Sequence, residues 1–127
     1  MSAPDASEVG RRLLLVQQVL DRVEPADLAD EVAAGALVVD IRPAENRLSE
    51  GEMPDALVVD RTVLEWRMDP TSDHRLLESD DPDRRVVLVC NEGYSSSFAA
   101  ESLRRLGLRR ATDLVGGYRA WREQTDA

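Results

Sequence analysis

The sequence predicts an α/β domain whose central sheet is mainly parallel and is flanked by helices on both faces. Short, wholly apolar runs rich in valine recur at residues 36–39, 56–59 and 86–89, as in strands buried on both sides of a parallel sheet. Helical patterns lie between these runs, which is typical of βαβ units. The 127 residues suffice for one domain with a single core, and no linker or internal repeat divides them.

The N-terminal part of the chain is expected to be helical. Residues 1–7 are small and polar and are expected to fray. Apolar residues then recur at helical spacing from Glu8 to Val23, and Pro25 is expected to end this helix. A second helical pattern runs from Asp27 to Ala34, with Gly35 in the position of a C-terminal glycine.

Strands and helices are expected to alternate in the rest of the chain. The expected strands cover residues 36–40, 56–59, 86–90 and 111–114. The expected helices cover residues 62–68, 95–106 and 118–124, and the Asp-, Pro- and Ser-rich segment between the first two is typical of a loop over residues 69–85. Side chains expected to pack inside are Phe98, Ala99, Leu103, Leu106, Trp66 and Trp121, whereas His74 is expected to be solvated.

Charge and composition exclude several classes of function. All 16 basic residues are arginine, and with 25 acidic residues they give a net charge of −9, which repels nucleic acid and anionic lipid. No apolar run approaches the roughly 20 residues that span a bilayer, and the N-terminus lacks the pattern of a secretory signal. We therefore expect a cytoplasmic protein with no nucleic-acid or membrane partner. A single cysteine excludes an internal disulfide and an all-thiolate metal site, and we expect neither metal nor cofactor.

The single cysteine, Cys90, lies at the end of the most apolar predicted strand. The segment that follows leads into a helix, and ligands of open α/β sheets bind beyond the carboxyl ends of the strands. Backbone N–H groups and the dipole at a helix N-terminus favour an anionic sulfur at such a point. From position alone, Cys90 is either a reactive thiol or a small buried hydrophobic residue. The serines at 95–97 likewise either cap the helix or donate hydroxyls to a ligand.

Four short motifs follow one another along the chain. They are Asp40-Ile41-Arg42, the segment Gly51–Ala56, the segment Cys90–Ser96, and Gly116-Gly117-Tyr118-Arg119-Ala120-Trp121. In this order they resemble the motifs of single-domain rhodaneses. The family's counterparts are Asp-x-Arg, Gly-His-Ile-Pro-Gly-Ala, a six-residue loop that the catalytic cysteine opens and that has glycine in fourth place, and Gly-Gly-aromatic-x-x-Trp.

The resemblance implies a rhodanese-like domain over residues 25–124, preceded by an extension, residues 1–24, with an amphipathic helix. It implies a sulfurtransferase in which the Cys90 thiolate takes a sulfane sulfur from a small-molecule donor, forms a persulfide and passes the sulfur to a thiol acceptor. Asp40 and Arg42 are expected to support the site structurally. The substrate-binding loop implied by the resemblance consists of Asn91, Glu92, Gly93, Tyr94, Ser95 and Ser96.

The loop departs from the family pattern in its charge. Many rhodaneses have arginine directly after the cysteine and again later in the loop, where this chain has Asn91 and Ser95. Glu92 adds a negative charge, so a dianionic donor such as thiosulfate should be disfavoured. Arg61 and Arg67 follow the second predicted strand and either bring cations to the same rim or stay solvated.

Two other functions use a cysteine loop that leads into a helix. A cysteine phosphatase needs an arginine after five further residues, where this chain has Ser96, and its loop is longer by one residue, which argues against this class. The other is a non-enzymatic or relay module that docks to a protein partner and carries or senses persulfide. A retained cysteine does not separate such a module from an enzyme. The length of the chain is compatible with a monomer or a homodimer.

Overall fold

A computed structural model describes residues 6–126 of the chain. In this part of the chain, four strands form one parallel sheet in the order β2-β1-β3-β4. The predicted parallel α/β fold and its four strands are confirmed. Their bounds are β1 (Leu37–Asp40), β2 (Leu57–Val58), β3 (Val86–Val89) and β4 (Ala111–Asp113).

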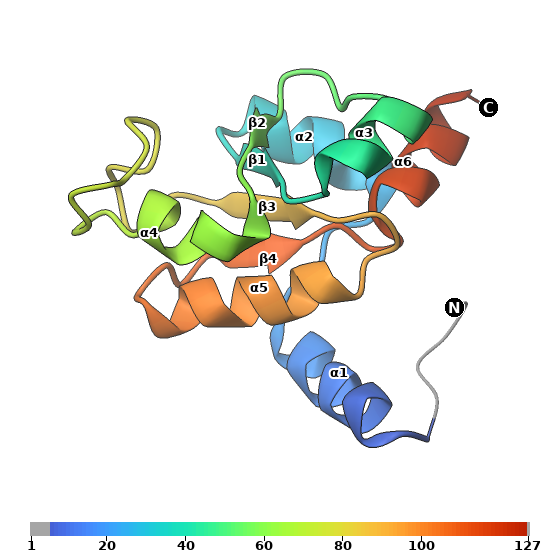
Figure 1. Cartoon of the computed structure of the whole chain (residues 1–127), viewed down its shortest axis with the longest axis horizontal. Helices are drawn as coiled ribbons and strands as arrows, with labels where there is room; N and C mark the ends of the chain where they lie inside the picture. The colour runs from blue at the N-terminus through green and yellow to red at the C-terminus, as the bar shows by residue number, and fades with distance from the viewer. Residues whose placement is uncertain (1–5, 127) are drawn as a thin grey trace.

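Helices cover both faces of this sheet (Figure 1). One face carries α1 (Glu8–Val19), α4 (Leu64–Met68) and α5 (Ser95–Arg105). The other face carries α2 (Leu28–Ala33) and α6 (Gly117–Asp126), with α3 (Ala44–Glu50) beside α6. Across residues 6–126, every helix is too short or too polar to cross a bilayer.

The central strand β3 is apolar at every position because both of its faces are covered. All four of its residues are buried. Because side chains of a strand alternate between faces, Val86 and Leu88 pack into the cluster beneath α4 and α5, whereas Val87 and Val89 pack into the cluster beneath α2 and α6. The strand therefore joins two hydrophobic layers, as expected for the interior of a parallel sheet.

The first helix ends earlier than its sequence pattern predicts. It stops at Val19, Leu20 is already extended, and Val23 pairs with Leu114 as a parallel one-residue bridge beyond β4. The Val23 N–H donates to the Asp113 carbonyl at 3.0 Å, and the Val115 N–H donates to the Val23 carbonyl at 2.8 Å. These two bonds satisfy the backbone at the sheet edge, so the predicted helix over 8–23 is wrong in its last turn.

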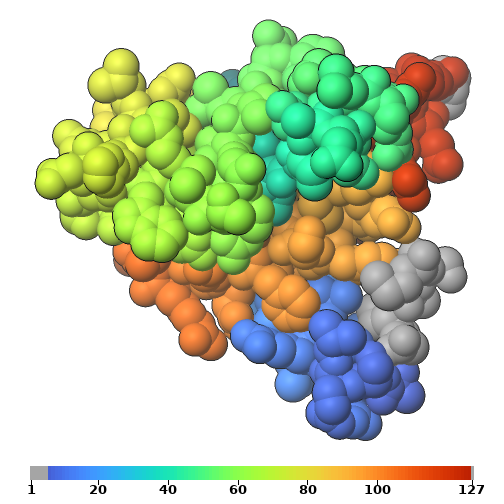
Figure 2. All heavy atoms as spheres, viewed as in Figure 1, coloured from blue at the N-terminus to red at the C-terminus, as the bar shows by residue number. Residues whose placement is uncertain are grey.

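The start of this helix is also more ordered than predicted. Of the expected frayed terminus, residues 1–5 lie outside the described residues. Ser7 is the N-cap of α1, and its hydroxyl oxygen accepts a hydrogen bond from the Gly10 N–H at 3.0 Å. Figure 2 shows the resulting helix (blue) against the segment that holds the cysteine loop and α5 (orange).

Helix α3 was not predicted because none of its residues is buried. Hydrophobic periodicity therefore carries no signal here, although the flanking residues do. Pro43 lies directly before the helix and Gly51 directly after it, which is the usual asymmetry of helix ends. The helix matters for function because its last residue, Glu50, lies at the cysteine loop.

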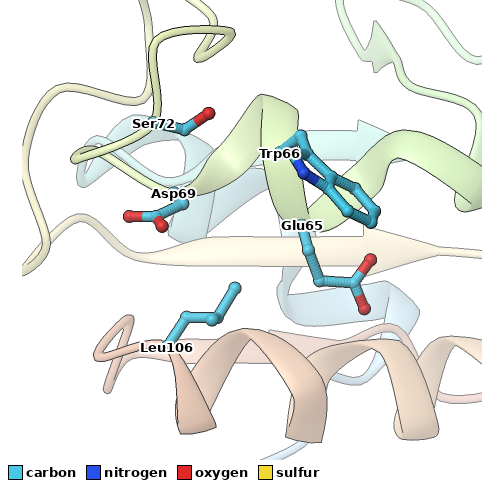
Figure 3. Close-up of a pocket in the computed structure, with 5 residues that line it drawn as sticks. All are labelled: Glu65, Trp66, Asp69, Ser72 and Leu106. Carbon is cyan, nitrogen blue, oxygen red and sulfur yellow. The ribbon is translucent and has the colours of Figure 1, made fainter.

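Two residues expected to pack inside are instead exposed. Leu106 lies just past the end of α5 and is 43% exposed, and Trp66 on α4 is 58% exposed. Both line an open hollow between α4 and the end of α5, together with Glu65, Asp69 and Ser72 (Figure 3). The other packing predictions agree with the structure: Trp121 packs against the core beneath α6, and His74 is exposed.

We predict that Leu103→Ala lowers the free energy of unfolding by about 2–5 kcal/mol, because Leu103 is fully buried and its removal leaves a cavity. The matched change Leu106→Ala should cost less than about 1 kcal/mol because its side chain is already in contact with solvent. Chemical denaturation of both variants tests this assignment. Equal losses would contradict the inward and outward placement of the two leucines.

Candidate functional site

The polar ends of three neighbouring strands meet at one edge of the sheet. The register pairs Asp40 with Val89 and Leu88 with Asp113. Cys90 directly follows β3, between the ends of β1 and β4. The sheet thus brings Asp40, Cys90 and Asp113 to its carboxyl edge, where ligands of this architecture bind.

The loop after Cys90 curls back over the sulfur. The Gly93 N–H donates to Cys90 Sγ at 3.1 Å, and the Cys90 thiol donates to Ser96 Oγ at 3.2 Å. Cys90 is only 6% exposed. Helix α5 starts at Ser95, so its N-terminal dipole adds to the amide in favouring negative charge on sulfur. These are the features of a site that can hold a thiolate or a persulfide.

Glycines at two places allow the loop backbone to approach the turn after β4. Gly93 has φ of +84°, and a Cβ at this residue would lie 2.7 Å from the Gly116 nitrogen. A Cβ at Gly117 would lie 2.5 Å from the Cys90 carbonyl oxygen. The next residue, Tyr118, donates its N–H to that same carbonyl at 2.8 Å. The Gly116-Gly117 turn therefore packs directly against the backbone of the cysteine loop, and a side chain at Gly93 or Gly117 would clash there.

The serines at 95–97 do not cap helix α5 with their side chains, which was one of the two roles expected for them. The N-cap of α5 is Tyr94, which makes no side-chain cap hydrogen bond, and Ser95 is exposed. Ser96 and Ser97 are buried, and both hydroxyls donate to Asp113 Oδ2 at 2.7 Å. Ser96 thereby links the sulfur to a carboxylate.

That carboxylate belongs to a group of residues that sequence reasoning missed. Asp113 is fully buried, and Arg22 binds it through both oxygens, with Nε 2.8 Å from Oδ1 and Nη2 3.2 Å from Oδ2. Arg22 Nη2 also donates to the Gly93 carbonyl at 2.8 Å, and Gln17 Nε2 donates to it at 3.4 Å. A polar residue inside an otherwise buried strand was the available signal for Asp113. Nothing in the sequence pattern pointed to Arg22 or Gln17.

The outer side of the loop carries a second charged network. Asn91 Nδ2 donates to Glu50 Oε2 at 3.0 Å, and Arg119 Nε donates to Glu50 Oε1 at 2.9 Å. Arg119 Nη1 also lies 3.5 Å from Glu92 Oε1. The hydrogen bonds from Arg119 and then Asn91 hold the pKa of Glu50 below its ordinary value, and Glu50 in turn raises the pKa of Arg119.

Arginines that the sequence suggested for this rim are engaged elsewhere. Arg61 binds Glu65 at 2.9 Å, and Arg67 donates to the His74 carbonyl at 2.7 Å. The guanidinium beside Glu92 is instead that of Arg119, from the last helix. Arg119 is shared between the carboxylates of Glu50 and Glu92, and Arg122 donates to the Glu50 carbonyl.

Asp40 and Arg42 form a buried ion pair next to the loop. Arg42 Nη2 lies 2.8 Å from Asp40 Oδ2 and donates to the Gly51 carbonyl at 2.9 Å. Its guanidinium carbon lies 3.8 Å from the centre of the Tyr118 ring, a cation–π contact. Because the Tyr118 backbone holds the Cys90 carbonyl, this geometry fits structural support of the loop rather than contact with a substrate.

Metal ligands do not gather near the sulfur or elsewhere in residues 6–126. No three side chains among the His, Cys, Asp and Glu residues of this part lie close enough to hold an ion.

Comparisons with known proteins identify the family of this domain. The model of the rhodanese-like domain family matches residues 24–124. The chain is 29% identical over 94 residues to the adenylyltransferase and sulfurtransferase MOCS3 of Oryza sativa subsp. japonica, a match that covers 71% of this chain and 21% of that protein. The chain spans only 10–21% of the length of the curated relatives that it matches.

Solved structures share the fold over most of the chain. A Rhodopseudomonas palustris protein of unknown function, named a "possible tyrosine phosphatase", has a TM-score of 0.83 and 25% identity, with 98% of this chain and 96% of that chain covered. The human single-domain sulfurtransferase TSTD1 has a TM-score of 0.66 and 28% identity, with 81% of this chain and 96% of that chain covered.

We predict that Arg42→Ala lowers the free energy of unfolding by about 3–5 kcal/mol, because it leaves the Asp40 carboxylate buried without its partner. The matched change Arg61→Ala removes an exposed i,i+4 pair and should cost about 0.5 kcal/mol or less. Urea unfolding of the two variants measures the difference. An Arg42→Ala variant as stable as Arg61→Ala would rule out the structural role of the pair.

Proposed function

This chain belongs to the rhodanese-like domain family, and on that premise we propose that it is a sulfurtransferase that carries a sulfane sulfur as a persulfide on Cys90. The observation that carries the proposal is the arrangement around Sγ: an inward amide from Gly93 at 3.1 Å, a hydroxyl from Ser96 at 3.2 Å, and the start of α5. The relatives TSTD1 and MOCS3 are named as sulfurtransferases, which supports the same class of reaction.

The proposed reaction consists of two displacements at sulfur. The Cys90 thiolate attacks the outer sulfur of a donor, so that a bond forms from Sγ to that sulfur. The bond between that sulfur and the rest of the donor breaks, and the leaving group departs with the electron pair. A thiolate acceptor then attacks the terminal sulfur of the persulfide, which releases the Cys90 thiolate and yields the acceptor persulfide. No general base has to act in the transfer step if the loop already holds the thiolate.

The phosphatase activity suggested by the name of the R. palustris protein is not favoured for this chain. A phosphatase loop holds the phosphate with an arginine, whereas the corresponding residue here is Ser96. Ser96 is fully buried and donates to Asp113, so it faces a carboxylate rather than an anionic substrate. A dianionic phosphate would meet no loop guanidinium of its own.

The charges around the loop favour a donor with little negative charge. Glu50 and Glu92 flank Arg119, so one cation is shared between two carboxylates. We infer that low-molecular-weight persulfides are better donors than dianionic thiosulfate, and that a small thiol is the acceptor. Both substrates are small molecules in this proposal.

We predict that Cys90→Ser folds normally and does not transfer sulfur, because a hydroxyl stays protonated and cannot hold a sulfane sulfur. Intact mass spectrometry after incubation with glutathione persulfide, cysteine persulfide, 3-mercaptopyruvate or thiosulfate tests this. The wild type should gain one sulfur atom from at least one donor, and Cys90→Ser should gain none. A wild type that never gains sulfur would remove the enzyme proposal.

The same experiment separates an enzyme from a relay module. After loading, the protein is mixed with a small thiol such as glutathione and its mass is measured again. Loss of the extra sulfur over many cycles supports the free enzyme. Loading without release to small thiols would support a module that passes the persulfide to a docked protein partner.

We further predict that Glu92→Gln raises the rate with thiosulfate about threefold at low ionic strength, because it removes like charge from the side of the loop that receives the donor. The gain should shrink as salt is added, since exposed charges are screened over about 10 Å at 0.1 M. Glu78→Gln, the same change in an exposed loop, is the matched control and should leave the rate unchanged. Equal rates for both variants would show that Glu92 has no part in donor choice.

A further inference from the structure

The N-terminal segment, residues 8–23, lies outside the part of the chain that the family model matches, which starts at residue 24. It nevertheless reaches the cysteine loop. Two of its side chains, Arg22 and Gln17, donate hydrogen bonds to the Gly93 carbonyl at 2.8 and 3.4 Å. Gly93 is also the residue whose N–H donates to Cys90 Sγ at 3.1 Å. The N-terminal segment therefore binds the carbonyl of Gly93, the residue whose N–H contacts the sulfur.

Arg22 has a second contact that bears on the charge of the sulfur. The Asp113 carboxylate is fully buried and lies two hydrogen bonds from Sγ, through Ser96 at 3.2 and 2.7 Å. An isolated carboxylate at this place would repel a thiolate, and burial would strengthen that repulsion. Arg22 binds both carboxylate oxygens, so the sulfur faces a neutral pair instead of a negative charge.

Ser96 has only one hydroxyl proton to share between these groups. In the structure the thiol donates to Ser96 and Ser96 donates to Asp113. When Cys90 is a thiolate, the same hydroxyl can turn to donate to Sγ. Asp113 then keeps two partners, Arg22 and Ser97, and does not become a buried carboxylate without hydrogen bonds.

We propose that Arg22 is a positioning residue for the Cys90 nucleophile: by neutralising Asp113 and holding the Gly93 carbonyl, it lets the thiolate form and persist. The proposal rests on the proposed function in that it assigns to the N-terminal segment a part in the same site. Arg22 does not touch the reacting atoms. It acts through Asp113, Ser96 and Gly93.

The other charged groups beside the cysteine loop are the same in every variant tested below. Asp40 pairs with Arg42, Glu50 and Glu92 pair with Arg119, and Arg122 donates to the Glu50 carbonyl and pairs with Asp126. The Arg22–Asp113 pair is the one that reaches Sγ through Ser96. A change in the net charge of the Arg22–Asp113 pair should therefore shift the pH midpoint of Cys90 alkylation, and the sign of that charge sets the direction of the shift.

The test is a charge cycle read by iodoacetamide, a neutral reagent that alkylates the thiolate and needs no sulfur donor. The rate is measured against pH for the wild type, Arg22→Met, Asp113→Asn and the double variant. Arg22→Met leaves an unpaired carboxylate, so the midpoint should rise by about one pH unit, which makes alkylation about tenfold slower below the midpoint. Asp113→Asn leaves an unpaired cation, so the midpoint should fall. The midpoint of the double variant should lie close to that of the wild type, because both charges of the pair are removed.

Arg104→Met is the matched control. Arg104 also fastens the N-terminal segment, through the Val19 carbonyl at 3.0 Å and Asp21 at 2.7 Å, but it does not contact the loop. It should lower thermal stability without moving the midpoint. If Arg22→Met does not fold, Asp113→Asn and the double variant still report the sign of the charge effect.

Two results would overturn the proposal. One is an Arg22→Met midpoint equal to that of Arg104→Met, and the other is an Asp113→Asn midpoint at or above that of the wild type. Failure of the proposed function has a different signature. In that case the midpoints shift as expected while the wild type gains no sulfur from any donor, and the positioning role of Arg22 stands without a sulfurtransferase.

Discussion

A carboxylate that is fully buried at the end of a strand has to be neutralised and hydrogen-bonded, and much of this site is arranged around that requirement at Asp113. Its oxygens receive both donors of the Arg22 fork and the hydroxyls of Ser96 and Ser97. These partners come from the segment before the sheet and from the first turn of α5. The hydrogen bonds to Asp113 therefore fix the position of the first turn of α5, next to the sulfur. They also fix the position of the N-terminal segment that carries Arg22.

The loop of Cys90 has two sides with different chemistry. On the inner side, the Arg22–Asp113 pair is mostly buried, so its effect on the sulfur through hydrogen bonds is screened much less by salt. On the outer side, Arg119 is shared between Glu50 and Glu92 in contact with solvent, so its effect on an approaching donor depends on ionic strength. The inner side suits control of the nucleophile, and the outer side suits choice of the donor.

The sequence predicts those parts of the fold that each segment determines by itself. Strands β1 and β3 can be predicted because each is a run of apolar residues, and Cys90 can be located because it ends the most apolar run. The end of α1 cannot be predicted from the sequence, because Leu20 and Val23 would be buried in a helix as well as next to an edge bridge. Helix α3 buries no side chain and so leaves no periodic pattern. Arg22 and Asp113 lie 91 residues apart, and only the folded sheet edge brings them together.

The close fit between the cysteine loop and the Gly116-Gly117 turn has a consequence for the order of events during synthesis. The turn that supports the Cys90 carbonyl, and the strand that carries Asp113, both follow the cysteine in the chain. While the polypeptide is being made, Cys90 therefore emerges before the parts that shape its loop. The newborn chain carries Cys90 without the Asp113 carboxylate and the Gly-Gly turn, and the contacts that these make to the loop form only when β4 and α6 have docked. Under the proposed function, assembly of the nucleophile's surroundings is thereby coupled to completion of the fold.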